Sequence, residues 1–285
     1  MRILSWNIQW GRGLDGTVDL ARIARTIRSH GTFDVICLQE VAVNFPGLAG
    51  SRGEDQAALL AAEFQDHHPV FAPATDVPDA QGHRKQFGNL LLSRLPVGQV
   101  WRHLLPWPAD AAVPSMQRVL LEAVVGSGAS ALRVLTTHLE YYSAKIRRAQ
   151  IDAIRGLQAE ACAQARAPRA GDGEAGGSFE VFARPATAVL CGDMNFAAAA
   201  PERQQMLAPF ADGTPAWRDG WEVLHGDAPH PATAGVHKQS FTASPQCYDF
   251  FFLSANLAPR LRRLEVDATT TASDHQPVWI ELATD

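Results

Sequence analysis

The order of apolar runs is the feature that most restricts the fold of this chain. β-prone runs at residues 2–8 and 33–40 are separated by a helical pattern at 17–29, where Val18, Ile23 and Ile27 share one face. Two further helical patterns cover 54–68 and 143–166. After residue 68 strand-like runs dominate, with the helical pattern at 143–166 lying among them. This order favours an α/β fold with two sheets packed face to face and helices outside, over a doubly wound parallel sheet.

The later strand-like runs lie at 87–97, 98–105, 118–125, 131–139, 187–195, 247–254, 260–266 and 276–282. The Gly-containing stretch at 167–177 predicts a surface loop. No internal repeat and no separating linker interrupts the pattern. We therefore expect one catalytic domain over residues 1–285.

Charge and cysteine content narrow the functional class. The chain carries 25 basic and 30 acidic side chains, a net charge of −5, which argues against a strongly basic nucleic-acid binder while leaving room for a local basic patch. No C-x-x-C motif accompanies the four cysteines, so a zinc ribbon is not expected. The N-terminus reads as a strand, with neither a signal peptide nor a membrane span. These features predict a cytoplasmic protein without membrane contact, and we expect a monomer.

Polar residues that are costly to bury stand at the ends of several apolar runs. Carboxylates suit a hard cation such as Mg²⁺, imidazoles exchange protons near neutral pH, and amides bind phosphate oxygens without adding charge. Each of these polar residues, taken alone, has a simpler explanation as part of a turn or as a capping group. Their repetition at so many strand ends predicts a phosphoryl-transfer site. They are Asn7, Glu40, His138, Asp193, Asn195, Asp249, Asp274 and His275.

A competing motif lies beside the first strand. Gly11–Gly16 fits G-x-G-x-x-G between a strand and a helix, and Glu40 follows 24 residues after Gly16 (40 − 16). However, Trp10 stands immediately before Gly11, where close packing would be awkward, and the glycines explain none of the later motifs. An NAD(P)-binding enzyme is therefore a remote alternative, and these glycines are more simply a loop near the site.

Seven segments in order carry a resemblance that spans residues 3 to about 281: "SWNIQ", "ICLQEV", "GNLLLSRLPV", "TTHLE", "CGDMN", "YDFFFLS" and "SDHQPV". In this order and spacing the chain resembles the endonuclease/exonuclease/phosphatase superfamily. "GDMN" followed by "SDH" is its most specific part. The resemblance implies a four-layered α/β sandwich, two central mixed β-sheets flanked by helices, and hydrolysis of phosphoesters with Mg²⁺ or Mn²⁺.

The resemblance also implies roles for individual residues. Metal binding falls on Glu40, with Asn7 beside it, and on Asp274. Asp193 corresponds to the aspartate that orients or deprotonates the attacking water, and Asp249 to the acid that pairs with the final histidine. The implied catalytic set is His138, Asp193, Asn195, Asp249 and His275.

The substrate is the least determined part of the resemblance. "THLEYYSAKIRRAQ" is similar to the tyrosyl-DNA phosphodiesterase branch, which suggests substrate-binding roles for Glu140 and Arg148, and Asn89 is a polar candidate near the site. Deoxyribonucleases place a carboxylate in the segment where this chain has "KQFGNLLLSR", and none occurs here, which weakens transfer of nuclease activity. We expect a phosphodiesterase acting on nucleic acid or a small phosphodiester. A phosphomonoesterase, a sphingomyelinase-like enzyme and an inactive binding protein of the same fold are the alternatives.

Overall fold

The two predicted sheets are present in the computed structural model, which describes residues 1–167, 176–237, 242 and 244–283. Sheet 1 has the strand order β11-β12-β1-β2-β4-β3. Its strands are β1 (Arg2–Asn7), β2 (Val35–Val43), β3 (His68–Pro78), β4 (Arg84–Ser93), β11 (Leu261–Val266) and β12 (Val278–Leu282).

Sheet 2 has the order β5-β6-β7-β8-β10-β9. Each sheet is mixed, because β1 runs parallel to β2 and β7 parallel to β8, while the other pairs are antiparallel. The strands of sheet 2 are β5 (Val97–Leu104), β6 (Val119–Val125), β7 (Leu132–His138), β8 (Ala188–Asp193), β9 (Trp217–Asp219) and β10 (Asp249–Ser254).

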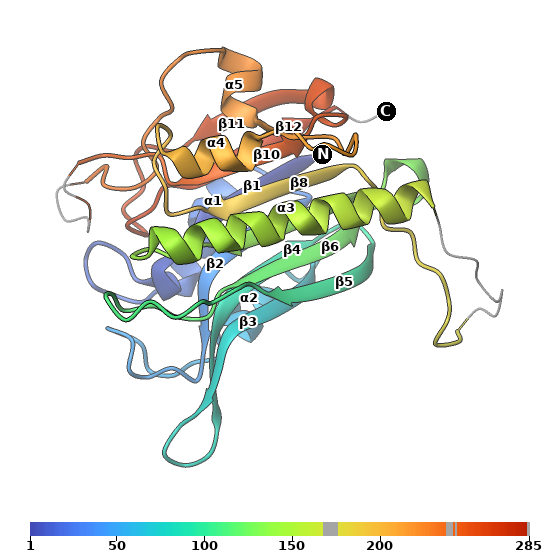
Figure 1. The fold of residues 1–285 in the computed structure, drawn as a ribbon. Coiled ribbons are helices and arrows are strands. Elements are labelled where there is room, and N and C mark those ends of the chain that lie inside the picture. Colours follow the sequence, from blue (N-terminus) through green and yellow to red (C-terminus); the bar gives the residue numbers. More distant parts are fainter. Residues whose placement is uncertain (168–175, 238–241, 243, 284–285) are drawn as a thin grey trace.

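Helices connect the parallel strands, as a parallel pair requires a crossover. α1 joins β1 to β2 and is capped by Asp19, whose side chain accepts from Arg22 N; α3 joins β7 to β8 and is capped by Ser143. Figure 1 shows α3 running across one outer face of the sandwich. The helices are α1 (Leu20–Ser29), α2 (Gln56–Glu63), α3 (Ala144–Arg166), α4 (Pro201–Leu207) and α5 (Gly220–His225), with short 3-10 turns η1 (Gln9–Gly11), η2 (Gly128–Ser130) and η3 (Ala258–Arg260).

Three apolar layers hold the sandwich together. The largest lies between the sheets and includes Ile3, Cys37, Val189 and Phe251; a second packs α1 and α2 on sheet 1, and a third packs α3 and α4 on sheet 2. Because side chains alternate along a strand, Leu4 and Trp6 of β1 face the helices while Ile3, Ser5 and Asn7 face the other sheet. The expected four-layered α/β sandwich is therefore confirmed.

One expectation about local structure differs from the observed elements, and another falls mostly outside the described residues. The helical pattern at 54–68 ends as α2 at Glu63, and residue 68 instead begins β3, a strand that the sequence did not predict. Of the predicted loop at 167–177, residues 168–175 lie outside the described residues. None of the helices in the described ranges is both long enough and apolar enough to cross a lipid bilayer.

Candidate active site

Strand register brings three polar side chains together at one end of sheet 2. His138 ends β7 and lies opposite Asp193 at the end of β8, and Asp193 lies opposite Asp249 at the start of β10. Each lies two residues along its strand from a residue that faces the other sheet: His138 from Thr136, Asp193 from Cys191, and Asp249 from Phe251. Residues two apart on a strand point to the same side. All three polar side chains are therefore directed into the space between the sheets.

Sheet 1 supplies the facing half of the cluster. Asn7 ends β1, Glu40 lies in β2 where the pairing with β4 shifts register, and the segment before β12 carries Asp274 and His275. That segment is tied to β1, because Ser273 Oγ donates to Asn7 O at 2.8 Å and Trp6 Nε1 donates to His275 O at 2.9 Å. The cluster therefore depends on both sheets.

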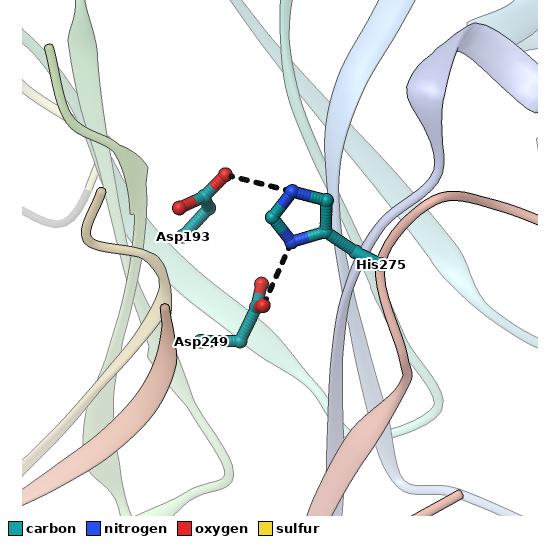
Figure 2. A group of neighbouring side chains, drawn as sticks. All are labelled: Asp193, Asp249 and His275. Carbon is teal, nitrogen blue, oxygen red and sulfur yellow. Dashed lines mark hydrogen bonds and ion pairs between the residues drawn. The ribbon is translucent and has the colours of Figure 1, made fainter. Parts of the chain in front are cut away.

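His275 lies between two aspartates (Figure 2). Its Nδ1 is 2.8 Å from Asp249 Oδ2 and its Nε2 is 3.6 Å from Asp193 Oδ2. Burial alone would lower the pKa of His275, but the two carboxylates outweigh burial and raise that pKa to about 10. The imidazole is therefore cationic at neutral pH. Burial, with help from the Asp249 charge, raises the pKa of Asp193 to about 6.

Amide groups hold Asp193 and Glu40 in place. Asn7 Nδ2 donates to Asp193 Oδ2 and to Glu40 Oε1, both at 3.0 Å, while Asn7 Oδ1 accepts from the backbone N of Gln9. Asp193 Oδ1 accepts from Asn195 N at 2.9 Å, and Asn195 Nδ2 donates to Leu139 O. Glu40 and Asn195 both have positive φ, at 61° and 51°. Such strained backbone concentrates at functional sites.

Glu40 and Asp274 form an acidic pair, and the charge of His275 only partly offsets the effect of their burial. Burial, followed by the charge of Asp274, raises the pKa of Glu40 to about 7. Burial also raises the pKa of Asp274, whose Oδ2 accepts from Gln9 Nε2 at 2.6 Å. Two partly buried carboxyl groups with oxygen atoms available suit a hard divalent cation, which would favour their ionised forms.

A cavity of about 400 Å³ opens over this cluster and shows residues that the sequence had not singled out. Arg118, at the position before β6, is only 7% exposed. Its Nε has no hydrogen-bond partner among the described residues and lies 3.9 Å from Glu140 Oε2. Burial and the charge of Arg118 hold the pKa of His138 well below its usual value, so His138 is neutral. The lining also includes Gln9, Trp10, Glu40, Tyr141, Tyr142, Asp193, Asn195, Asp274 and His275.

The three residues proposed from sequence to bind substrate are not among the residues that line this cavity. Asn89 is buried and donates to Val119 O at 3.0 Å, which ties sheet 1 to sheet 2. Glu140 is buried, and its Oε1 accepts from Tyr142 N. Arg148 faces α4, where its Nε lies 3.8 Å from Glu202 Oε1.

One group among the described residues has ligand atoms close enough together to hold a metal ion. In Asp193, Asp249 and His275 these atoms all lie within 4.8 Å of one another. The protonated His275 already neutralises this group, and its Nδ1 is engaged by Asp249 at 2.8 Å. His275 offsets the burial of Glu40 and Asp274 only in part, and the pKa of each stays raised, so we regard them as the better donors for a divalent ion.

Comparison with known proteins adds a family match. A model described as the Endonuclease/Exonuclease/phosphatase family matches residues 4–275. A search of curated proteins finds no match.

Solved structures share the fold at low sequence identity. An endonuclease/exonuclease/phosphatase from Beutenbergia cavernae DSM 12333 is 24% identical with a TM-score of 0.69, covering 98% of this chain and 70% of its own. A mannosyl-6-phosphatase from Bacteroides thetaiotaomicron VPI-5482 is 17% identical with a TM-score of 0.65, covering 100% of both chains. D. rerio TDP2, complexed with a single-strand DNA product, is 19% identical with a TM-score of 0.62, covering 100% of this chain and 99% of its own.

Proposed function

Because this chain belongs to the endonuclease/exonuclease/phosphatase family, we propose that it is a metal-dependent hydrolase of phosphoester bonds and acts mainly on phosphodiesters. The observation that carries the proposal is the meeting of Glu40, Asp193 and Asp274 with two histidines in one cavity. Solved relatives with this fold include a sugar-phosphate phosphatase and a protein bound to a DNA product. A phosphomonoesterase is therefore the second candidate.

The metal site in this proposal consists of Glu40 and Asp274, with Asn7 orienting the Glu40 carboxylate. A bound Mg²⁺ or Mn²⁺ supplies positive charge at the phosphoryl and leaving oxygens. Side chains of the protein carry out the other steps. Asp193, ionised above its pKa of about 6, accepts a proton from the attacking water. Asn7 and the backbone N of Asn195 keep its two oxygens oriented.

Three donors stabilise the charge that develops on the phosphoryl group. His275, kept protonated by Asp249, donates through Nε2 as a cation. His138 is neutral and donates a hydrogen bond without adding charge, while the Arg118 guanidinium supplies a further cation. Preorganised donors of this kind each contribute roughly 3 kcal/mol to transition-state stabilisation.

Glu40→Gln tests the proposed function most directly. We expect wild-type turnover to disappear with a chelator and to return with Mg²⁺ or Mn²⁺, and the variant to bind metal about tenfold more weakly or worse. Glu63→Gln, at an exposed position paired with Arg28, is the control. The substrate panel contains bis(4-nitrophenyl) phosphate, 4-nitrophenyl phosphate, single-stranded DNA, sphingomyelin vesicles and an inositol polyphosphate. Wild-type turnover by Glu40→Gln, or chelator-resistant turnover, would contradict the proposal; activity on monoesters alone would favour the second candidate.

Asp249→Asn is expected to shift the alkaline limb of the pH–rate profile to lower pH. His275 stays protonated below its pKa of about 10, so wild-type activity falls only as the pH rises through that value. Without the Asp249 charge this pKa drops, the limb moves to lower pH, and kcat decreases on the order of 10²-fold. Rates between pH 5 and pH 10.5, with His275→Ala as reference, measure the shift. Full kcat with an unmoved limb would show that the two residues do not act as a pair.

A further inference from the structure

We infer that Trp10, Tyr141 and Tyr142 form a subsite for a planar aromatic ring attached to the phosphate, an inference that rests on the proposed function. These three aromatic side chains line the same cavity as Glu40 and Asp193. Trp10 follows β1 of sheet 1, and the tyrosines follow β7 of sheet 2. Aromatic rings are thus supplied from both sheets beside the reacting phosphate.

The backbone around Trp10 holds the indole in an unusual position. Residues 9 and 10 are both left-handed, with φ of 46° and 44°, a conformation that is unfavourable for residues other than glycine. Two hydrogen bonds maintain it: Trp10 Nε1 donates to Ala49 O at 2.9 Å, and Gln56 Nε2 donates to Trp10 O at 2.8 Å. The fold therefore fixes the ring rather than leaving it free.

The two tyrosines are also presented by a fixed turn. Tyr142 N donates to Glu140 Oε1 at 2.9 Å, and Arg147 Nη1 donates to Tyr141 O at 3.0 Å. The rings meet edge to face, with centroids 4.7 Å apart and planes at 82°. Tyr141 is 37% exposed and Tyr142 58% exposed. A preorganised exposed ring loses little entropy when another ring stacks on it.

Charge in the cavity limits the number of phosphates it can take. Of the described residues that line it, Arg118 alone is a lysine or arginine, whereas Glu40, Asp193 and Asp274 are acidic. A chain of phosphates would need several cations along its path. One phosphate at the reaction centre with a ring against the aromatic side chains matches this lining. The ring is either the base of a nucleoside phosphoester or the aryl group of an aryl phosphoester.

Binding of simple monophosphates tests the subsite without turnover. Calorimetry in Mg²⁺ compares methyl phosphate, ribose 5-phosphate, phenyl phosphate and thymidine 5′-monophosphate on the whole protein. We expect at least one ringed ligand to bind about tenfold or more tightly than its ring-free counterpart, since stacking of one base contributes 1–3 kcal/mol. An advantage for phenyl phosphate alone identifies an aryl ester, and an advantage for thymidine monophosphate alone identifies a nucleoside ester.

Matched variants separate ring stacking from other effects. Tyr142→Leu should remove most of the advantage, and Tyr142→Phe should retain it. Phe182→Leu is the control, because Phe182 is 50% exposed and lines a different cavity. The inference is overturned if ringed and ring-free ligands bind alike, or if none of the ringed ligands binds. It is also overturned if the advantage survives in both Tyr142→Leu and Trp10→Leu. Chelator-sensitive hydrolysis of glycerophosphocholine, a phosphodiester without an aromatic ring, is measured separately and reports on the proposed function alone.

Discussion

Asp193→Asn is expected to fold normally and to lose about 10³-fold in kcat, since a positioned general base contributes 10²–10⁴-fold. The substitution keeps the shape of the side chain and preserves an oxygen for Asn195 N, but removes the basic group. Wild-type activity should fall as the pH drops through about 6, where Asp193 becomes protonated. The variant should lack this acidic limb.

Steady-state rates between pH 4.5 and pH 8, with circular dichroism to verify folding, measure this effect. Asp152→Asn is the matched control, because Asp152 lies on α3 and bonds the exposed Gln205 rather than any group in the cavity. If Asp193→Asn keeps kcat within a few-fold of the wild type, another group activates the water.

Glu122→Gln is expected to lower the free energy of unfolding by about 3–5 kcal/mol, because it removes the carboxylate that pairs with the buried Arg133 and one of the two that pair with Arg184. Glu122 is fully buried on β6; its Oε1 accepts from Arg184 Nε at 2.8 Å and from Arg133 Nη1 at 3.3 Å, and its Oε2 lies 3.0 Å from His103 Nε2. Burial would raise the pKa of Glu122, but these partners outweigh burial and lower the pKa to about 2.

Urea unfolding of wild type and variant measures the difference. Glu160→Gln is the matched control: Glu160 also bonds Arg184, but its side chain is 54% exposed, so a loss below about 1 kcal/mol is expected. The lowered pKa adds a pH test. The unfolded carboxyl titrates near pH 4.3, so the stabilisation is present above that value and is lost as the pH falls toward about 2. Equal losses in the two variants would contradict a special role for the buried pair.

The sandwich could be predicted from the sequence because most of its strands are apolar, β-prone runs. β3 was missed because it contains residues that argue against a strand. Pro69, Pro73 and Pro78 lie within β3, and proline removes ladder donors, so the pattern did not indicate a strand. β3 tolerates them because it is the last strand of sheet 1, with one edge unpaired in the sheet. The position of a strand in the sheet, which decides this tolerance, is not visible in the local sequence.

The polar strand ends of the candidate site were visible in the sequence, but some of their neighbours were not. Arg118 precedes a mostly apolar run, which could have marked it as a charge at a strand start. Gln9 and Trp10 reach the cavity only because the chain turns left-handed directly after β1, and such a turn has no pattern in non-glycine residues. The pairing of Glu40 with Asp274 depends on the packing of separate strands and needed the fold.

The two ends of the chain complete sheet 1 together. β1 pairs with β12, with Arg2 opposite Glu281, and Met1 N donates to Leu282 O, whereas the whole of sheet 2 comes from the uninterrupted stretch 97–254. On the ribosome, sheet 2 can form while β1 still lacks its neighbouring strand β12. Asp274 and His275 are synthesised immediately before β12. If these two residues act as proposed, a growing chain gains hydrolytic activity only after synthesis has passed them. An early stop also leaves sheet 1 with an open edge prone to aggregation.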